Sequence, residues 1–349
     1  MASVLERDLL RRNDSSMANL NLLLQSDSNI VQTTKSLLIH SIDYGTRDSR
    51  VSDVTVTIHD SFIERRWRHS EHENDRQDIE DFFQAIGSLP NLKSLSFYAG
   101  SYGNPPEMPV PLIVEALRGS RKRLQRLKIH GVSMFLGNST SRIAINLSDL
   151  VETLRHHPAL QEVSIVRSFF GMAEGEDERQ EEYYIRTGIL GMAYEGLFQA
   201  CSTIQNLECL GVHHRRTGNF VSVLNNPLNP STLCQFRNLQ RLRQLEVFNF
   251  KIEEEHLEQF AMEFEPENNG HDGGMGFPNL QELSLSCTSF GKQACIAIAK
   301  IINSANKQTN KQTSSWWIAQ YVFGMPRMSE FKYRMLSDSC HCIGRKLSS

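Results

Sequence analysis

The residue types that most often bind metals are present in the chain, but not at the spacing a metal site requires. Cys340, His341 and Cys342 offer ligand atoms near the C-terminus. A structural zinc site needs four ligands at suitable spacing, and no second pair lies nearby in the sequence. His69 and His72 lie in a heavily charged stretch. We therefore predict no metal site and no cofactor.

The sequence also contains none of the short motifs that place a nucleophile or a phosphate group. G-x-S-x-G, the Walker A motif and H-E-x-x-H are all absent. The glycines between Pro266 and Gly276 precede a strand pattern and do not join a strand to a helix. They indicate a flexible insertion and not a phosphate-binding loop. We predict that the protein is not an enzyme.

One dense run of basic residues could bind an anion. It consists of Arg118, Arg121, Lys122, Arg123, Arg126 and Lys128. The ligand would be an acidic protein segment or a nucleic acid. Alternatively, the run is a solvated turn between a helix and a strand, and the acidic stretch at 174–182 neutralises it. The run has no interleaved aromatic residues and the net charge of the chain is -3, so a nucleic acid is not the expected partner.

An apolar triplet recurs along the chain and sets its organisation. Six segments carry the pattern L-x-x-L-x-L or a close variant, and they begin at Leu92, Leu124, Leu160, Leu207, Leu242 and Leu280. The last two positions of each triplet alternate as one face of a strand does. A helical pattern such as Leu112, Ile113, Ala116 and Leu117 precedes or follows most of them. One strand and one helix cannot bury their own apolar side, so each unit needs similar neighbours.

This array resembles a leucine-rich-repeat protein of the ribonuclease-inhibitor type. The resemblance covers residues 89–303 and implies a curved α/β solenoid, with parallel strands on the concave face and helices on the convex face. The family's Asn or Cys after the third leucine is replaced here by Gly100, Val132, Ser168, Arg215, Phe250 and Thr288. The units are also longer than the usual length of about 20 to 29 residues, since Leu95 and Leu127 are already 32 apart (127 − 95). We therefore expect insertions, the largest at 172–187.

Composition shifts divide the chain into four parts. We predict a polar N-terminal segment at 1–35 that is helical or disordered, a solenoid at 36–303, a polar linker at 304–315, and a C-terminal tail or cap at 316–349. Strands are expected near 37–39 and 54–58. The charged stretch at 64–81 is interpreted as a surface loop that leads into a helix containing Ile79, Phe82, Phe83 and Ile86. Trp316, Trp317 and Phe323 either cover the open end of the solenoid or dock elsewhere.

The candidate binding residues lie between the leucines. In a strand the leucine positions point to the core and the alternating residues point outward. In a solenoid these outward residues line the concave face, which commonly binds partners. The candidates with this outward phase are Tyr98, Arg126, Lys128, His130, His213 and Phe248. The alternative is a sheet face that is simply solvated.

These observations predict a non-catalytic protein–protein interaction scaffold that binds a protein partner on its concave face. Two other roles stay open: a leucine-rich-repeat regulator of a small GTPase, and the substrate-recognition arm of a ubiquitin ligase. No F-box pattern is recognisable in residues 1–50. Seven scattered cysteines suit a reducing compartment. No apolar run approaches the roughly 20 residues needed to span a bilayer, so we expect a cytoplasmic protein without membrane partners.

Overall fold

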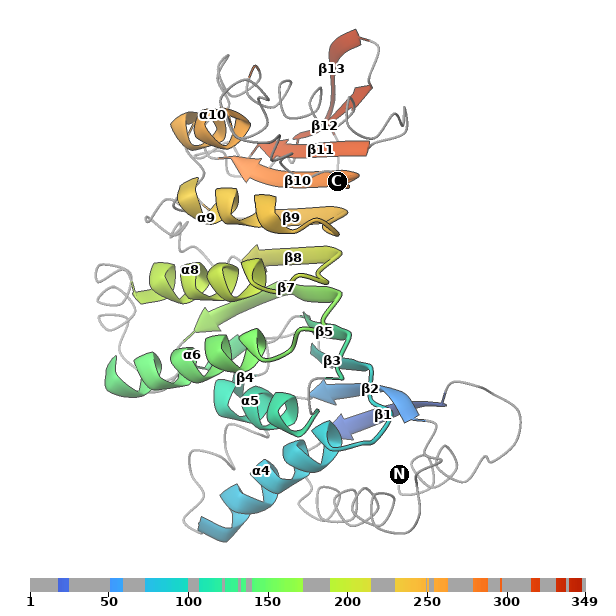
Figure 1. The fold of residues 1–349 in the computed structure, drawn as a ribbon, viewed down its shortest axis with the longest axis vertical. Coiled ribbons are helices and arrows are strands. Elements are labelled where there is room, and N and C mark those ends of the chain that lie inside the picture. Colours follow the sequence, from blue (N-terminus) through green and yellow to red (C-terminus); the bar gives the residue numbers. More distant parts are fainter. Residues whose placement is uncertain are drawn as a thin grey trace. The chain divides into compact units, whose positions relative to one another are not determined.

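The computed structural model describes most of the predicted strands and helices. The described residues are 18–24, 51–58, 73–99, 107–120, 123–130, 133–135, 140–171, 189–214, 230–248, 250, 254–262, 279–287, 296, 315–320, 331–336 and 339–346. The chain forms two compact units, Met1–Glu178 and Arg179–Ser349 (Figure 1). They are called unit 1 and unit 2 below.

Unit 1 is built on five parallel strands in chain order. They are β1 (Ala18–Leu24), β2 (Val51–Ile58), β3 (Ser94–Ala99), β5 (Arg126–His130) and β7 (Glu162–Gly171). A second, smaller ladder joins β4 (Glu107–Pro109) to β6 (Ser133–Phe135), and β6 to the far end of β7. Parallel neighbours require a crossover connection, and helices supply it between β2 and β3, between β3 and β5, and between β5 and β7.

Three helices cover one side of this sheet in unit 1 (Figure 1). They are α4 (Glu73–Gly87), α5 (Val110–Gly119) and α6 (Thr140–Arg155). In α5, Pro111 lies in the first turn, where its missing N–H costs nothing. The apolar residues predicted to share one helix face are buried in both α4 and α5. The helices expected at these positions are therefore confirmed.

Unit 2 repeats the parallel arrangement and then reverses direction. Its parallel strands are β8 (Cys209–His214), β9 (Gln244–Phe248), β10 (Glu282–Cys287) and β11 (Ser315–Gln320). The strands β12 (Phe331–Leu336) and β13 (Ser339–Lys346) then continue from β11 in antiparallel order. The helices are α8 (Ile189–Ser202), α9 (Pro230–Cys234) with the short 3₁₀ turn η2 (Gln235–Asn238), and α10 (Glu254–Met262).

The apolar triplets form the core of each unit. Leu95 lies opposite Leu127, and Leu127 lies opposite Val163. In unit 2, Leu245 lies between Leu210 and Leu283 in the same way. All of these side chains are buried, and each burial is worth about 1.5–3 kcal/mol relative to an exposed side chain. The six predicted strands and the α/β class with parallel strands are confirmed.

A backbone turn recurs before several of the strands. The turn is made by backbone N–H groups, each of which donates to the carbonyl oxygen of the residue just before the neighbouring strand. The donors are Gln125, Gln161, Arg243 and Gln281, and each donor–acceptor distance is 2.7 Å. The triplet leucines Leu92, Leu160, Leu207 and Leu242 each donate to the carbonyl three residues earlier. Buried backbone groups must be paired, and this repeated pattern pairs them without any particular side chain.

Three segments differ from the sequence predictions. Residues 18–24 form β1, which pairs with β2, so this part of the N-terminal segment is neither helical nor disordered. The helix α4 begins at Glu73, inside the stretch predicted to be a surface loop. Gln77 and Gln84 are exposed on this helix, and Gln77 donates to Asp81 over 2.8 Å. The helical turn at 230–238 was not predicted, although it buries Leu233 and Phe236.

Other predictions fall outside the described residues. These are the strand at 37–39, the insertions at 172–187 and 266–276, the linker at 304–314, and all of the helix at 295–302 except Ile296. At the C-terminal end, Trp316 lies opposite Leu283 in the pairing of β11 with β10, and Trp317 lies opposite Ser284. Among the described residues, no helix is long and apolar enough to cross a membrane.

Candidate partner-binding face

The side chains between the core positions form an outward face on the strands of unit 1. The strand β5 shows this alternation directly, because Leu127 and Ile129 are buried while Arg126, Lys128 and His130 are not. The pairing registers align these residues with their neighbours. The outward face of unit 1 consists of Asp53, Thr55, Thr57, Ser94, Ser96, Tyr98, Arg126, Lys128, His130, Glu162, Ser164 and Val166.

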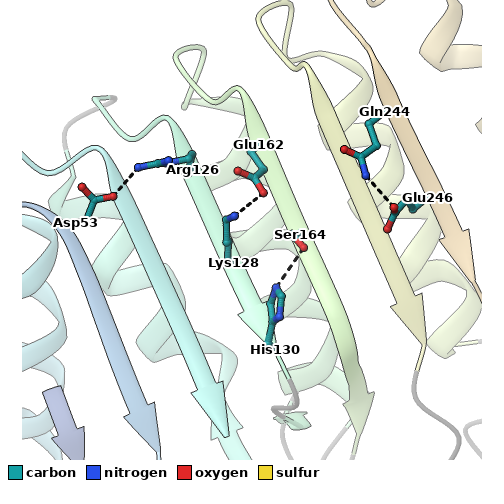
Figure 2. Close-up of polar contacts among 8 residues, drawn as sticks. All are labelled: Asp53, Arg126, Lys128, His130, Glu162, Ser164, Gln244 and Glu246. Carbon is teal, nitrogen blue, oxygen red and sulfur yellow. Dashed lines mark hydrogen bonds and ion pairs between the residues drawn. The ribbon is translucent and has the colours of Figure 1, made fainter. Parts of the chain in front are cut away.

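An ion pair spans three strands of this face. Arg126 Nη2 lies 2.5 Å from Asp53 Oδ1, and β3 lies between their strands (Figure 2). Ser94 stands between the two residues in register and is only 6% exposed. Neighbouring strands are about 4.8 Å apart, so only a long side chain can cross β3. Arg126 keeps 46% of its side chain exposed and retains donors for a further contact.

The other described cations of the basic run also have partners within the chain. Lys128 Nζ lies 2.7 Å from Glu162 Oε1 on the next strand (Figure 2). Arg118 contacts Glu115 at 2.8 Å and Asp149 at 3.6 Å. Arg123 donates to the carbonyl oxygen of Pro90. Arg121, Lys122 and the acidic stretch at 174–182 lie outside the described residues. The outward face of unit 1 therefore carries matched pairs of charges and not a basic excess.

Two aromatic rings form a platform beside these pairs. The rings of Tyr98 and His130 lie 4.9 Å apart between centroids, with an interplanar angle of 44°. His130 Nε2 also lies 3.3 Å from Ser164 Oγ on β7 (Figure 2). Both rings are half-buried. Tyrosine is one of the residues enriched at interface hot spots, and here its ring packs at a tilt against the imidazole of His130.

The outward face of unit 2 is organised around Glu246. His213 Nε2 lies 2.8 Å from Glu246 Oε2, and Gln244 Nε2 donates to Glu246 Oε1 over 2.8 Å (Figure 2). The hydrogen bond from His213 lowers the pKa of Glu246, and the bond from Gln244 and the charge of His213 lower it further. Burial opposes these effects by raising it. The carboxylate therefore stays ionised and holds two neighbouring side chains in place.

The structure brings the predicted site residues together in two groups. Tyr98, Arg126, Lys128 and His130 share the outward face of unit 1. His213 and Phe248 lie opposite each other on β8 and β9 of unit 2; the side chain of Phe248 is outside the described residues. The partners of these residues are Asp53, Glu162, Ser164 and Glu246. Outward phase marks all four as surface residues, but only the register shows which side chain each one meets.

The described residues include cysteines outside disulfide bonds but no cluster of metal ligands. Among them, no group of three His, Cys, Asp or Glu side chains could hold a metal ion. The free thiol of Cys201 lies in the core of unit 2, and burial raises its pKa to about 12. Cys201 therefore remains a protonated thiol and is a poor nucleophile.

No family model matches the chain, and no curated protein matches it. The assignment of a function therefore depends on the geometry of the two outward faces.

Proposed function

We propose that the protein is a leucine-rich-repeat solenoid that binds a protein partner on the outward faces of its parallel strands and catalyses no reaction. The observation that carries this proposal is the Tyr98–His130 platform, flanked by the Asp53–Arg126 and Lys128–Glu162 pairs. These side chains project from strands and not from loops, so the backbone fixes their spacing.

Preorganisation supports a binding role for this face. Ordering a long side chain on association costs about 0.5–1.5 kcal/mol. Arg126, Lys128 and His130 are already held by hydrogen bonds in the free protein. The entropy cost of ordering these side chains is therefore largely incurred during folding and not when a partner binds. The balanced charges favour a partner with both signs over a purely acidic one.

The cysteines suit a reducing compartment. Cys201, Cys209 and Cys234 form no disulfide bond within the described part of the chain. We place the protein in the cytoplasm on this basis, since disulfides form and persist in oxidising compartments.

The test is affinity capture with substitutions on the face and a matched control away from it. Tyr98→Ala with His130→Ala removes the platform, and Arg126→Gln removes one charge at nearly constant length. The control is His156→Ala, which truncates an exposed histidine just after α6. We expect the double variant to lose the captured partner at least tenfold (about 1.4 kcal/mol) and the control to retain it.

Thermal denaturation of each variant separates lost binding from lost folding. Partners that are captured equally well by the wild type and by a folded double variant would refute the proposal. Capture of a small GTPase in one nucleotide state only would give the regulator role, and capture of ubiquitin-ligase subunits would give the substrate-recognition role. Loss of the partner in Arg126→Gln alone would identify an acidic group of the partner as a contact.

A further inference from the structure

A buried histidine joins the ends of two neighbouring helices in unit 1. His157 follows α6, and Ser120 follows α5; each is only 3% exposed. His157 Nδ1 lies 2.6 Å from the carbonyl oxygen of Thr153. His157 Nε2 lies 2.9 Å from the carbonyl oxygen of Leu117 and 2.8 Å from Ser120 Oγ. Both ring nitrogens therefore face oxygen atoms at hydrogen-bonding distance.

The neutral ring can make these contacts in only one favourable way. It has a single N–H, and the short contact to Thr153 places that proton on Nδ1. The lone pair of Nε2 then needs a donor, and Ser120 carries the only hydroxyl among its contacts. The Ser120 hydroxyl thus donates to Nε2 when the ring is neutral.

The charged ring reverses one of these hydrogen bonds. With a second proton, Nε2 becomes a donor and Ser120 Oγ accepts from it, while the carbonyl oxygen of Leu117 lies within reach of the same N–H. The Ser120 hydroxyl then turns to the carbonyl oxygen of Leu117, 2.7 Å away, which also accepts from the backbone N–H of Ser120 over 3.0 Å and so uses both of its lone pairs. The ring can therefore take up a proton without leaving its site, because a rotation of the hydroxyl satisfies every group.

Among the described residues, no ion pair involves His157. The charged side chains of the two helix ends pair with one another: Arg118 with Glu115 and Asp149, and Arg155 and His156 with Glu152. The strands β5 and β7, which follow these helices, direct apolar residues inward. The carbonyl groups around the ring belong to the C-terminal ends of α5 and α6.

We propose that Ser120 and His157 form a proton-responsive joint between α5 and α6, in which the Ser120 hydroxyl donates to the neutral ring and turns to Leu117 when the ring is protonated. The joint lies just before β5 and β7, the strands that carry Arg126, Lys128, His130, Glu162 and Ser164. It does not depend on the proposed binding function. It gives the hydrogen bonding at these two helix ends a response to pH.

Ser120→Ala tests the joint because it removes the donor that only the neutral ring needs. Unfolding by denaturant is measured at pH 5 and pH 8, on either side of the value of about 6.5 at which an ordinary histidine titrates. At pH 8, the lone pair of His157 Nε2 in the variant faces the carbonyl oxygen of Leu117 and has no donor to accept from. We therefore expect the equilibrium constant for folding to fall roughly tenfold. At pH 5, Nε2–H still donates to Leu117, and the fall should be less than roughly threefold.

Two controls isolate the effect. Ser88 occupies the equivalent place after α4 and bonds only to the carbonyl oxygen of Gln84, so the cost of Ser88→Ala should not depend on pH. In a His157→Gln background, the cost of Ser120→Ala should lose its dependence on pH. An equal cost of Ser120→Ala at both pH values in the wild-type background would overturn the proposal.

A measurement on the wild-type protein covers the case in which Ser120→Ala does not fold. Nitrogen-15 NMR of the histidine side chains reports which ring nitrogen carries the proton. For His157 at pH 8, we expect the proton on Nδ1 and an unprotonated Nε2. A proton on Nε2 alone at pH 8 would mean that Ser120 is not the donor, and the proposal would fail.

Discussion

At the scale of single residues, the outward faces depend on acceptors that lie one or two strands away from their donors. Asp53 and Arg126 are 73 positions apart in the sequence, and His213 and Glu246 are 33 apart. The alternation of residues along a strand predicts which side chains point outward. It does not predict the pairs, because they depend on the register between strands separated by whole helices. The binding candidates could thus be named from sequence, but not the residues that hold them.

Glu246 should make the stability of unit 2 depend on pH in the acidic range. Its pKa is lowered from 4.5 in the folded protein, first by the hydrogen bond from His213. A carboxyl with a lowered folded-state pKa contributes stability above its unfolded-state pKa, and the contribution is lost as pH falls through the folded-state pKa. Glu246→Gln should therefore be less stable than the wild type at pH 6, and this difference should shrink as the pH falls below 4.5.

Chemical denaturation between pH 3 and pH 6 measures this difference. Glu282→Gln is the control, since Glu282 is a half-buried outward carboxylate of the neighbouring strand β10. A difference between wild type and Glu246→Gln that stays constant across the range would show that the contact with His213 does not stabilise the ionised carboxylate.

At the scale of elements, α4 and α5 approach each other through two glycines near their C-terminal ends. A Cβ atom on Gly87 would lie 1.9 Å from the carbonyl oxygen of Ala116. A Cβ atom on Gly119 would lie 2.6 Å from the carbonyl oxygen of Gln84. Both obstacles are backbone atoms, which cannot move away as a flexible side chain can. The contact between these helices therefore requires glycine at both positions.

Gly87→Ala and Gly119→Ala should both destabilise the protein, although alanine favours helices by about 1 kcal/mol over glycine. The clash outweighs that preference, and overpacking typically costs about 1–3 kcal/mol or more. The shorter contact predicts the larger loss for Gly87→Ala. Denaturant unfolding gives both values, with the exposed Gln199→Ala of α8 as a control expected within about 0.5 kcal/mol of wild type. A stabilised Gly87→Ala variant would mean that the helices do not approach this closely.

Most elements could be predicted from the sequence because their apolar positions have a clear period. The L-x-x-L-x-L triplets coincide with the strands β3, β5, β7, β8, β9 and β10. The buried residues of α4 and α5 follow the helical period. The strand β1 was missed because Leu22, Leu23 and Leu24 are consecutive, and such a run fits a helix as well as a strand. Its pairing with β2 decides the matter, and pairing is a long-range property.

At the scale of the whole molecule, the chain divides near residue 178, within the stretch that the sequence marks as the largest insertion. Each strand of a parallel array packs on its immediate neighbours, so a destabilising substitution in one strand should affect mainly the strands next to it. Leu283 is 2% exposed and lies between Leu245 and Trp316 in register. This arrangement allows a test of how far an effect spreads.

Leu283→Ala should cost about 2–5 kcal/mol, since it leaves a cavity in a packed core. Hydrogen exchange should show reduced protection in β9, β10 and β11, while β2, β3 and β5 of unit 1 keep theirs. The exposed Gln281→Ala serves as the control. A cost below about 0.5 kcal/mol would mean that Leu283 is not in the core, and equal loss of protection in both units would mean that they unfold together.

The long strand β7 has a consequence for how the chain tolerates changes in length. Its first part pairs with β5 and its last part with β6, and both ladders have an offset of 36 residues (162 − 126 and 169 − 133). One residue inserted between Phe135 and Glu162 leaves both ladders intact, because the stretch around α6 absorbs it. One residue inserted between Val166 and Phe169 shifts only the second ladder and turns its side chains to the opposite face. Restoring the match would require a compensating insertion between His130 and Ser133, so these two short links must change length together.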